Sequence, residues 1–75
     1  MSDLVTKLMQ YESGAMDEFE TLHFFARLIN GGTIHSLQGH YERTATSFVD
    51  AGYITRVNGK WIVTEAGEAA ASGEY

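Results

Sequence analysis

Histidines are the side chains in this sequence best suited to acid–base chemistry or metal binding, and there are three: His23, His35 and His40. A helical zinc site pairs histidines four residues apart, whereas His35 and His40 are five residues apart across a predicted turn. The chain contains no cysteine, which excludes disulfides and thiolate ligands. Its serines lack the glycine-flanked setting of a catalytic nucleophile. We therefore expect no catalytic residue, metal site or cofactor, and we predict that the protein is not an enzyme.

Carboxylates form a second group with chemical potential. Asp17, Glu18 and Glu20 are the densest acidic cluster, and Glu12 is near them in sequence. They could bind a cation or mimic the phosphates of a nucleic acid. They also suit the positive end of a helix, and Asp17 and Glu20 have capping-box spacing. We favour the helix-start interpretation.

A third group consists of polar residues suited to recognising a partner. Glutamine can read adenine, arginine can read guanine, and hydroxyl groups suit phosphate contacts. These residues lie on a predicted helix-turn-helix and on the hairpin that follows it. The candidate partner-binding residues are Gln38, His40, Arg43, Thr44, Ser47, Arg56, Lys60 and Trp61.

The charge balance limits the choice of partner. The formal net charge is −5, which disfavours a general phosphate-binding protein. Residues 33–64 are the only segment without an acidic excess, and they contain the predicted helix-turn-helix and hairpin. This asymmetry indicates that the segment meets a different kind of surface, although acidic faces also keep small domains in solution.

Helical spacing predicts the elements that position these residues. A first helix begins at a Ser2 cap and stops near Gly14. A second begins at the Asp17 cap and ends at Asn30-Gly31-Gly32. Its apolar stripe is formed by Phe19, Leu22, Ala26 and Ile29, widened by Phe25 and Leu28.

The next segment reads as a helix-turn-helix. Thr33 is the expected cap of a short helix over residues 34–38, and Gly39 is the expected turn residue. A longer helix is then expected over residues 41–51, with one face turned toward the core, and Gly52 should end it. The inward residues are Tyr41, Ala45, Phe48 and Val49.

Strands are predicted at residues 53–57 and 60–64, because Asn58-Gly59 between them favours a two-residue type I′ turn. That turn sets Arg56 opposite Trp61 and Ile54 opposite Val63. One face of the hairpin must pack on the helices, since an isolated hairpin is unstable in water. A last short helix should start at a Thr64 cap, run through Ala71 and end at Ser72-Gly73, leaving a frayed tail.

These elements predict one α+β domain over residues 1–75, a small winged helix-turn-helix-like fold with three to four helices and a two-stranded hairpin. No apolar run is long enough to span a membrane, and no export signal precedes the first helix, so we expect an intracellular protein without a membrane partner. A homodimer is an expectation too, because a domain of this size buries only about 60% of its unfolded surface.

Two resemblances extend this interpretation. The segment VDAGYITRVNGKWIVTEAGEAA resembles the wing of bacterial winged-helix regulators, where a helix ending in glycine leads to a hairpin and a Thr-Glu-Ala-Gly opening. Residues 11–54 resemble a family of small uncharacterised bacteriophage proteins with an acidic helix start, a Phe-Phe helix and a Leu-Gln-Gly-His-Tyr run followed by arginine. Glu42 stands where we expect a small residue in that family.

The phage resemblance implies an accessory protein that acts in the cytoplasm of the infected bacterial host. It supplies no reaction and no ligand. It leaves two roles open for Gln38, His40, Tyr41 and Arg43: a polar network that holds the turn, or a contact surface.

Three functions remain as hypotheses. The first is a non-enzymatic phage accessory protein that binds a host or phage protein or other macromolecule through its helix-turn-helix and hairpin. The second is a sequence-specific regulator, a homodimer, that binds duplex DNA with the same residues. The third is an acidic inhibitor that occupies the DNA site of a host protein.

Overall fold

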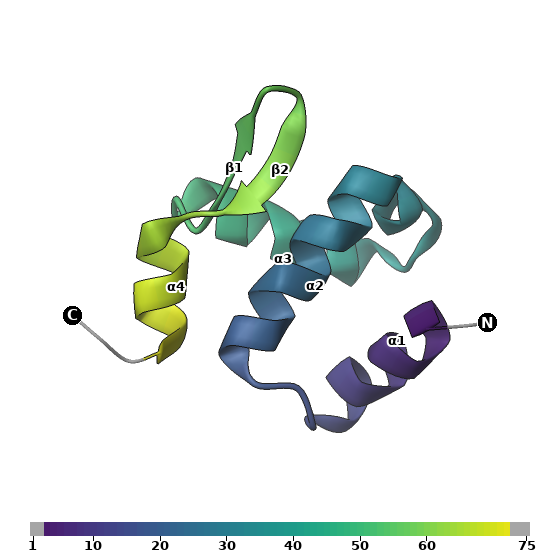
Figure 1. The fold of residues 1–75 in the computed structure, drawn as a ribbon. Helices are drawn as coiled ribbons and strands as arrows, with labels where there is room; N and C mark the ends of the chain where they lie inside the picture. The colour runs from purple at the N-terminus through teal and green to yellow at the C-terminus, as the bar shows by residue number, and fades with distance from the viewer. Residues whose placement is uncertain (1–2, 73–75) are drawn as a thin grey trace.

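The computed structural model describes residues 3–72, which form four α-helices, one 3₁₀ helix and a two-stranded antiparallel hairpin (Figure 1). The predicted Ser2 cap, the end of the last helix at Gly73 and the frayed tail lie outside the described residues. The predicted α+β, winged-helix-like class is confirmed. The elements are α1 (Asp3–Ser13), α2 (Glu18–Gly31), η1 (Thr33–Ser36), α3 (Gly39–Asp50), β1 (Ile54–Val57), β2 (Lys60–Val63) and α4 (Glu65–Ser72).

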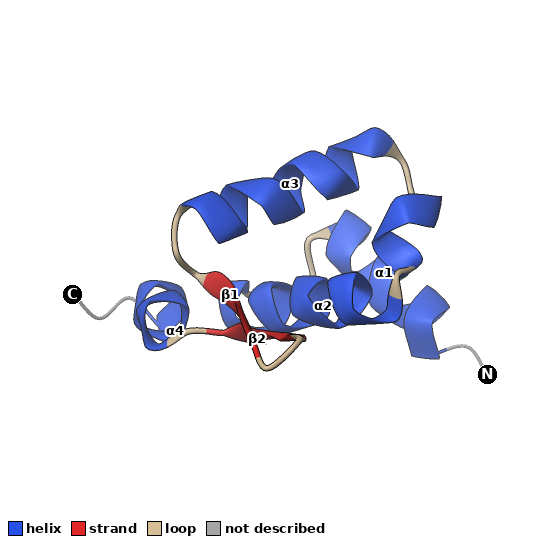
Figure 2. Cartoon of the chain, turned by 90° about the horizontal axis from the view of Figure 1, so that it is seen from above, coloured by secondary structure: helices blue, strands red, loops and turns tan. Residues whose placement is uncertain are grey.

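Helix α2 is the centre of the fold, with α3 on one side of it and the hairpin and α4 against its other parts (Figure 2). Its start is the predicted capping box. The Glu20 N–H donates to Asp17 Oδ1 at 2.8 Å, and the Asp17 N–H donates to Glu20 Oε1 at 3.3 Å. Its end is set by Gly32, whose φ of 74° is left-handed and whose N–H donates to Ile29 O.

The buried face of α2 differs from the predicted stripe at one flank. Leu22, Phe25, Ala26 and Leu28 are buried as expected, and Ile29 is half-buried, but Phe19 is 45% exposed and Phe24 is buried in its place. The cause is α1, which lies across the Phe24 side of α2. The Tyr11 ring of α1 contacts both Phe24 and Phe25, with centroid separations of 6.3 and 5.2 Å.

The turn of the helix-turn-helix is built differently from the prediction. The short helix is a 3₁₀ turn over Thr33–Ser36, and its preceding residue is Gly32, so Thr33 is its first residue and provides no side-chain cap. Gly39 is the first residue of α3 and lacks a positive φ. The residue with left-handed backbone that reverses the chain is Gly32, which is both the C-cap of α2 and the N-cap of η1.

The hairpin forms with the predicted register. Arg56 lies opposite Trp61 and Ile54 opposite Val63. Asn58 and Gly59 have φ values of 54° and 80°, the positive pair that a type I′ turn requires. Ile54 is fully buried and Trp61 and Val63 are half-buried, so this face packs on the helices.

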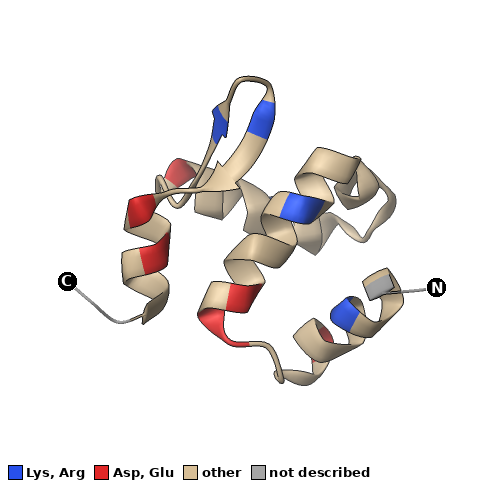
Figure 3. Ribbon diagram, in the orientation of Figure 1, with Lys and Arg blue, Asp and Glu red and all other residues tan. Residues whose placement is uncertain are grey.

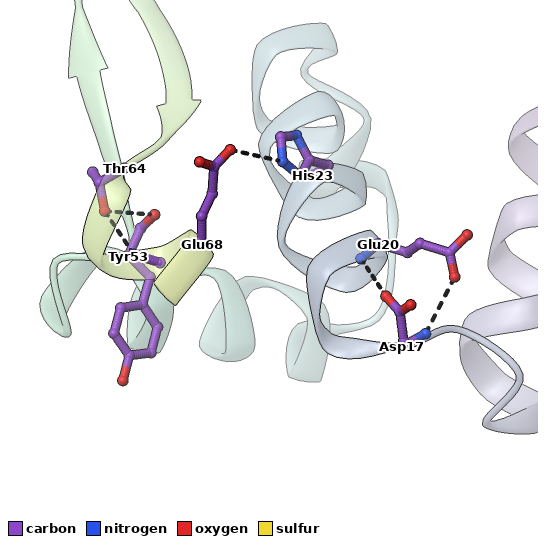
Figure 4. Close-up of polar contacts among 7 residues, drawn as sticks. Asp17, Glu20, His23, Tyr53, Thr64 and Glu68 are labelled. Carbon is purple, nitrogen blue, oxygen red and sulfur yellow. Dashed lines mark hydrogen bonds and ion pairs between the residues drawn. The ribbon is translucent and has the colours of Figure 1, made fainter. Parts of the chain in front are cut away.

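Thr64 caps α4, as predicted, and its side chain also forms hydrogen bonds with the segment before β1. Its Oγ1 accepts from the Gly67 N–H at 3.0 Å and donates to Gly52 O at 2.6 Å, and it lies 3.2 Å from Tyr53 O (Figure 4). Gly67 is buried, and a Cβ there would lie 2.5 Å from Tyr53 O. The helix can therefore approach Tyr53 this closely only because residue 67 has no side chain.

Candidate partner-binding surface

The predicted contact residues of α3 remain at the surface. Gln38, His40, Arg43 and Ser47 are exposed, and Thr44 is half-buried with its hydroxyl donating to His40 O at 2.8 Å. Among the described residues, no hydrogen bond joins the Gln38, His40 and Arg43 side chains, so the polar turn network does not form. Their exposure is what a contact surface requires, and their role in binding stays a prediction.

Tyr41, the other member of the proposed network, belongs to the core. It is 2% exposed, stacks on Phe25 and donates its hydroxyl to the Glu12 carboxylate of α1. Burial, with the Glu12 hydrogen bond as a second cause, raises the pKa of Tyr41 to about 12. The phenol is therefore a neutral tether between α1 and α3.

Of the predicted contact residues of the hairpin, two are exposed to solvent and one packs on the helices. Arg56 and Lys60 are exposed, whereas Trp61 is half-buried and packs against the core. The backbone of Trp61 is held by Asn30 at the end of α2. Asn30 Nδ2 donates to Trp61 O, and the Trp61 N–H donates to Asn30 Oδ1, both at 2.8 Å. The amide thus pairs with β2 as a neighbouring strand would, and it fixes the hairpin to α2.

An open hollow of about 360 Å³ lies where α3 faces the hairpin. Most of its wall is apolar, and its rim carries a polar pair, because His35 Nδ1 and Glu42 Oε2 are 2.7 Å apart. We call it the α3–hairpin hollow. It is lined by Ile29, Ile34, His35, Glu42, Ala45, Thr46, Val49 and Trp61.

The eight predicted site residues do not form one patch. Glu42, Thr46 and Val49 occupy the flank of α3 that faces Trp61. At about 100° per residue, His40, Arg43 and Ser47 occupy a different flank of the same helix. The structure therefore brings Trp61 to the hollow and leaves the polar residues of α3 on another side of the molecule.

Two contributors to this surface are absent from the predicted site. In the sequence Asn30 indicates only a helix stop, and Glu42 is only a departure from the phage pattern. Neither role leaves a local signal, since Trp61, the partner of Asn30, is 31 residues away and the hollow is lined by residues of four elements, α2, η1, α3 and β2.

Acidic residues cluster at the starts of α2 and α4, and further acidic residues lie on α1 and α3 (Figure 3). Basic residues are spread over α1, α2, α3 and both strands of the hairpin. No group of three or more potential metal ligands occurs among residues 3–72. In the same range, no helix is long and apolar enough to cross a bilayer.

The chain belongs to a family described as a domain of unknown function (DUF7417), whose model matches residues 1–73. The family therefore covers the whole of the described fold. No curated protein and no solved structure matches the chain.

Proposed function

We propose that this chain is a non-enzymatic phage accessory protein that binds a host or phage protein through the α3–hairpin hollow. The resemblance of residues 11–54 to small phage proteins supports the phage origin, and with it a site of action in the cytoplasm of the infected host. The hollow supports the binding role, and its chemistry favours protein over nucleic acid.

The observation that carries this proposal is the apolar wall of the hollow beside Trp61. Ile29, Ile34, Val49 and Trp61 form a concave apolar surface, and an apolar side chain of a partner would remove that surface from water. Glu42 and His35 at the rim supply directional polar contacts. A half-buried tryptophan next to such a hollow is the kind of residue that dominates protein interfaces.

Two neighbouring positions of α3 allow a sharp test. Thr46 is exposed in the wall of the hollow, whereas Ser47 is exposed on the other flank. A photo-crosslinking amino acid at position 46 should capture a discrete protein from a bacterial host lysate, and the same group at position 47 should not. Thr46→Arg should abolish capture by the bait and Ser47→Arg should preserve it. Equal capture from both positions would contradict the proposal.

Duplex DNA is a second candidate partner, favoured by the polar flank of α3. Gln38, His40, Arg43 and Ser47 are all accessible, as base and phosphate contacts require. A DNA-binding homodimer should retard a mixed duplex pool at low salt and lose affinity steeply as salt rises. Arg43→Ala and Lys60→Ala should weaken that retardation. Concentrated protein that leaves the pool unshifted at low salt would exclude this function.

The acidic-inhibitor hypothesis depends on the carboxylates at the start of α2. Glu20 already serves in the capping box with Asp17, which gives it a structural role. An inhibitor would require Glu18→Lys to disrupt partner capture while Ser47→Arg leaves it intact. Capture that survives the Glu18 reversal would contradict this function.

A further inference from the structure

The two edges of the hairpin are not equivalent. At the edge of β2, the N–H and C=O of Trp61 point outward, and both are paired with the Asn30 side chain. Arg56 is opposite Trp61, and a pair of this kind turns the peptide groups of its two residues away from each other. The N–H and C=O of Arg56 therefore point out from the edge of β1, where no other described residue bonds to them. The edge of β2 is closed at this level, and the edge of β1 is open.

The open edge is accessible and has apolar side chains beside it. Thr55, Arg56 and Val57 are all exposed, and the hairpin extends beyond the helices (Figure 1). Val57 is 46% exposed and Ile62 is 42% exposed, and the register places both on the face of the hairpin that is turned away from the helices. Unpaired peptide groups next to exposed apolar side chains are a template for another strand.

Charge changes sign along the hairpin. Arg56 and Lys60 carry the charge of the two strands, and both lie within two positions of the turn. At the base of the hairpin, Asp50 ends α3 and Glu65 begins α4. The hydrogen bonds of Thr64 hold the start of α4 beside the residues that precede β1. The turn is therefore positive and the base is negative, as the blue positions on the strands and the red positions on α4 show (Figure 3).

These four charged side chains are available for a partner. Among residues 3–72, no hydrogen bond or ion pair engages any of them. Glu68, the next carboxylate of α4, is already paired with His23 and is not counted with them.

We infer that the protein forms a homodimer in which β1 pairs antiparallel with β1 of a second copy, around a twofold axis at Thr55. This register sets Arg56 opposite Ile54 of the partner subunit, so that the outward peptide groups of both residues are hydrogen-bonded. It also sets Val57 opposite Tyr53 of the partner subunit and covers part of the exposed apolar side chain. A register centred on Arg56 is excluded, because it would place two like charges directly opposite each other.

A second copy fits this edge better than a strand of another protein. Any strand could bond to the peptide groups. Antiparallel pairing of two identical hairpins also places the positive turn of each one beside the negative base of the other, so the charges are complementary twice. The paired edges are short, and we therefore expect a weak dimer that forms as concentration rises. No residue of β1 lines the α3–hairpin hollow, so this inference is independent of the proposed function.

Sedimentation equilibrium of the full chain at low salt, from micromolar to millimolar concentration, should show a monomer–dimer equilibrium. Arg56→Pro removes the outward N–H, which the hairpin itself does not use, and should weaken dimerisation about tenfold or more. Arg56→Gln is the matched control, because it keeps the N–H and removes only the charge. It should weaken dimerisation less than Arg56→Pro does, and it should reduce the salt dependence. Hydrogen exchange at the Trp61 amide, which is bonded to Asn30, reports whether the hairpin of each variant is intact.

A second measurement tests the register without altering the peptide groups. The chain has no cysteine, so a single introduced thiol reports its distance from its own copy. Thr55→Cys should give a disulfide-linked dimer under mild oxidation, because the Cα atoms of such a central pair are about 4.5 Å apart. Ile62→Cys lies on the same face and should not, because three strand spacings, about 14 Å, would separate its two copies.

Three results would each overturn the inference. They are a wild-type chain that stays monomeric at millimolar concentration, unchanged dimerisation of Arg56→Pro with an intact hairpin, and equal disulfide yields from the two introduced thiols.

Discussion

Thr64 and Gly67 show how two residues explain a sequence resemblance. The Thr-Glu-Ala-Gly segment that resembles winged-helix regulators attaches α4 to the rest of the fold. Thr64 caps α4, and Gly67 allows the helix to approach Tyr53 O closely. Both residues serve the attachment of α4, and neither lines the α3–hairpin hollow. The resemblance therefore carries information about architecture and none about a ligand.

Gly67→Ala should destabilise the fold by about 2–3 kcal/mol, because the added Cβ meets backbone that cannot move aside easily. Gly31→Ala is the matched control. Its Cβ would lie 3.6 Å from Thr33 Oγ1 in ordinary contact, and its φ is not positive, so a gain of about 0.5–1 kcal/mol is expected. Urea unfolding of both variants measures the difference. A loss below about 0.5 kcal/mol for Gly67→Ala would contradict the close approach.

Tyr41 should make stability fall at alkaline pH. Its pKa is raised to about 12 in the folded protein, so between pH 10 and pH 12 the folded chain keeps a proton that the unfolded chain has lost. The stabilisation from Tyr41 is therefore complete below pH 10 and is lost as pH rises through 12. Unfolding measured at one-unit steps should show wild type and Tyr41→Phe converging above pH 10. Parallel profiles would mean that the phenol is not buried.

At the scale of elements, local chemistry made most of the fold predictable. The α2 capping box and the Asn58-Gly59 turn each involve residues within three positions of one another, and both formed as predicted. The predictions were wrong where an element distant in sequence determines which residue is buried or where a helix begins. Phe24 replaced Phe19 in the core because α1 covers that flank, and Gly39 entered α3 because Gly32 makes the reversal.

Asn30→Ala should loosen the hairpin specifically. The substitution removes two hydrogen bonds to the Trp61 backbone, for a loss of about 1–2 kcal/mol, partly offset by about 0.5 kcal/mol of better helix propensity. The specific readout is hydrogen exchange, which should accelerate at the Trp61 amide. The Gly67 amide, bound by Thr64 Oγ1, is the internal reference and should change only with global stability. Unchanged Trp61 exchange would contradict the anchoring role.

At the scale of the whole molecule, the sequence identified residue types for binding but could not group them. The candidate list combined Arg43 and Ser47 with Trp61, yet the structure assigns them to different sides because only one flank of α3 faces the hairpin. The hollow itself depends on how α2, η1, α3 and β2 pack, which no local pattern encodes.

The packing of α1 on the core bears on whether the protein forms the expected homodimer. Its inner side holds Tyr11, whose ring contacts Phe24, Phe25 and Tyr41, whereas Met9 on its outer side is 66% exposed. Tyr11→Ala should cost about 2 kcal/mol, less than the truncation of a fully buried aromatic, because Tyr11 is half-buried. Met9→Ala should stay within about 0.5 kcal/mol of wild type in a monomer.

Thermal unfolding of wild type and both variants at low and high protein concentration separates the two states of assembly. A monomer predicts a Tm independent of concentration and a large cost for Tyr11→Ala alone. A homodimer that uses the outer side of α1 predicts a Tm that rises with concentration and a cost for Met9→Ala that grows with it, because association stabilises the folded chain by mass action. A small cost for Tyr11→Ala in both conditions would mean that α1 does not pack on the core.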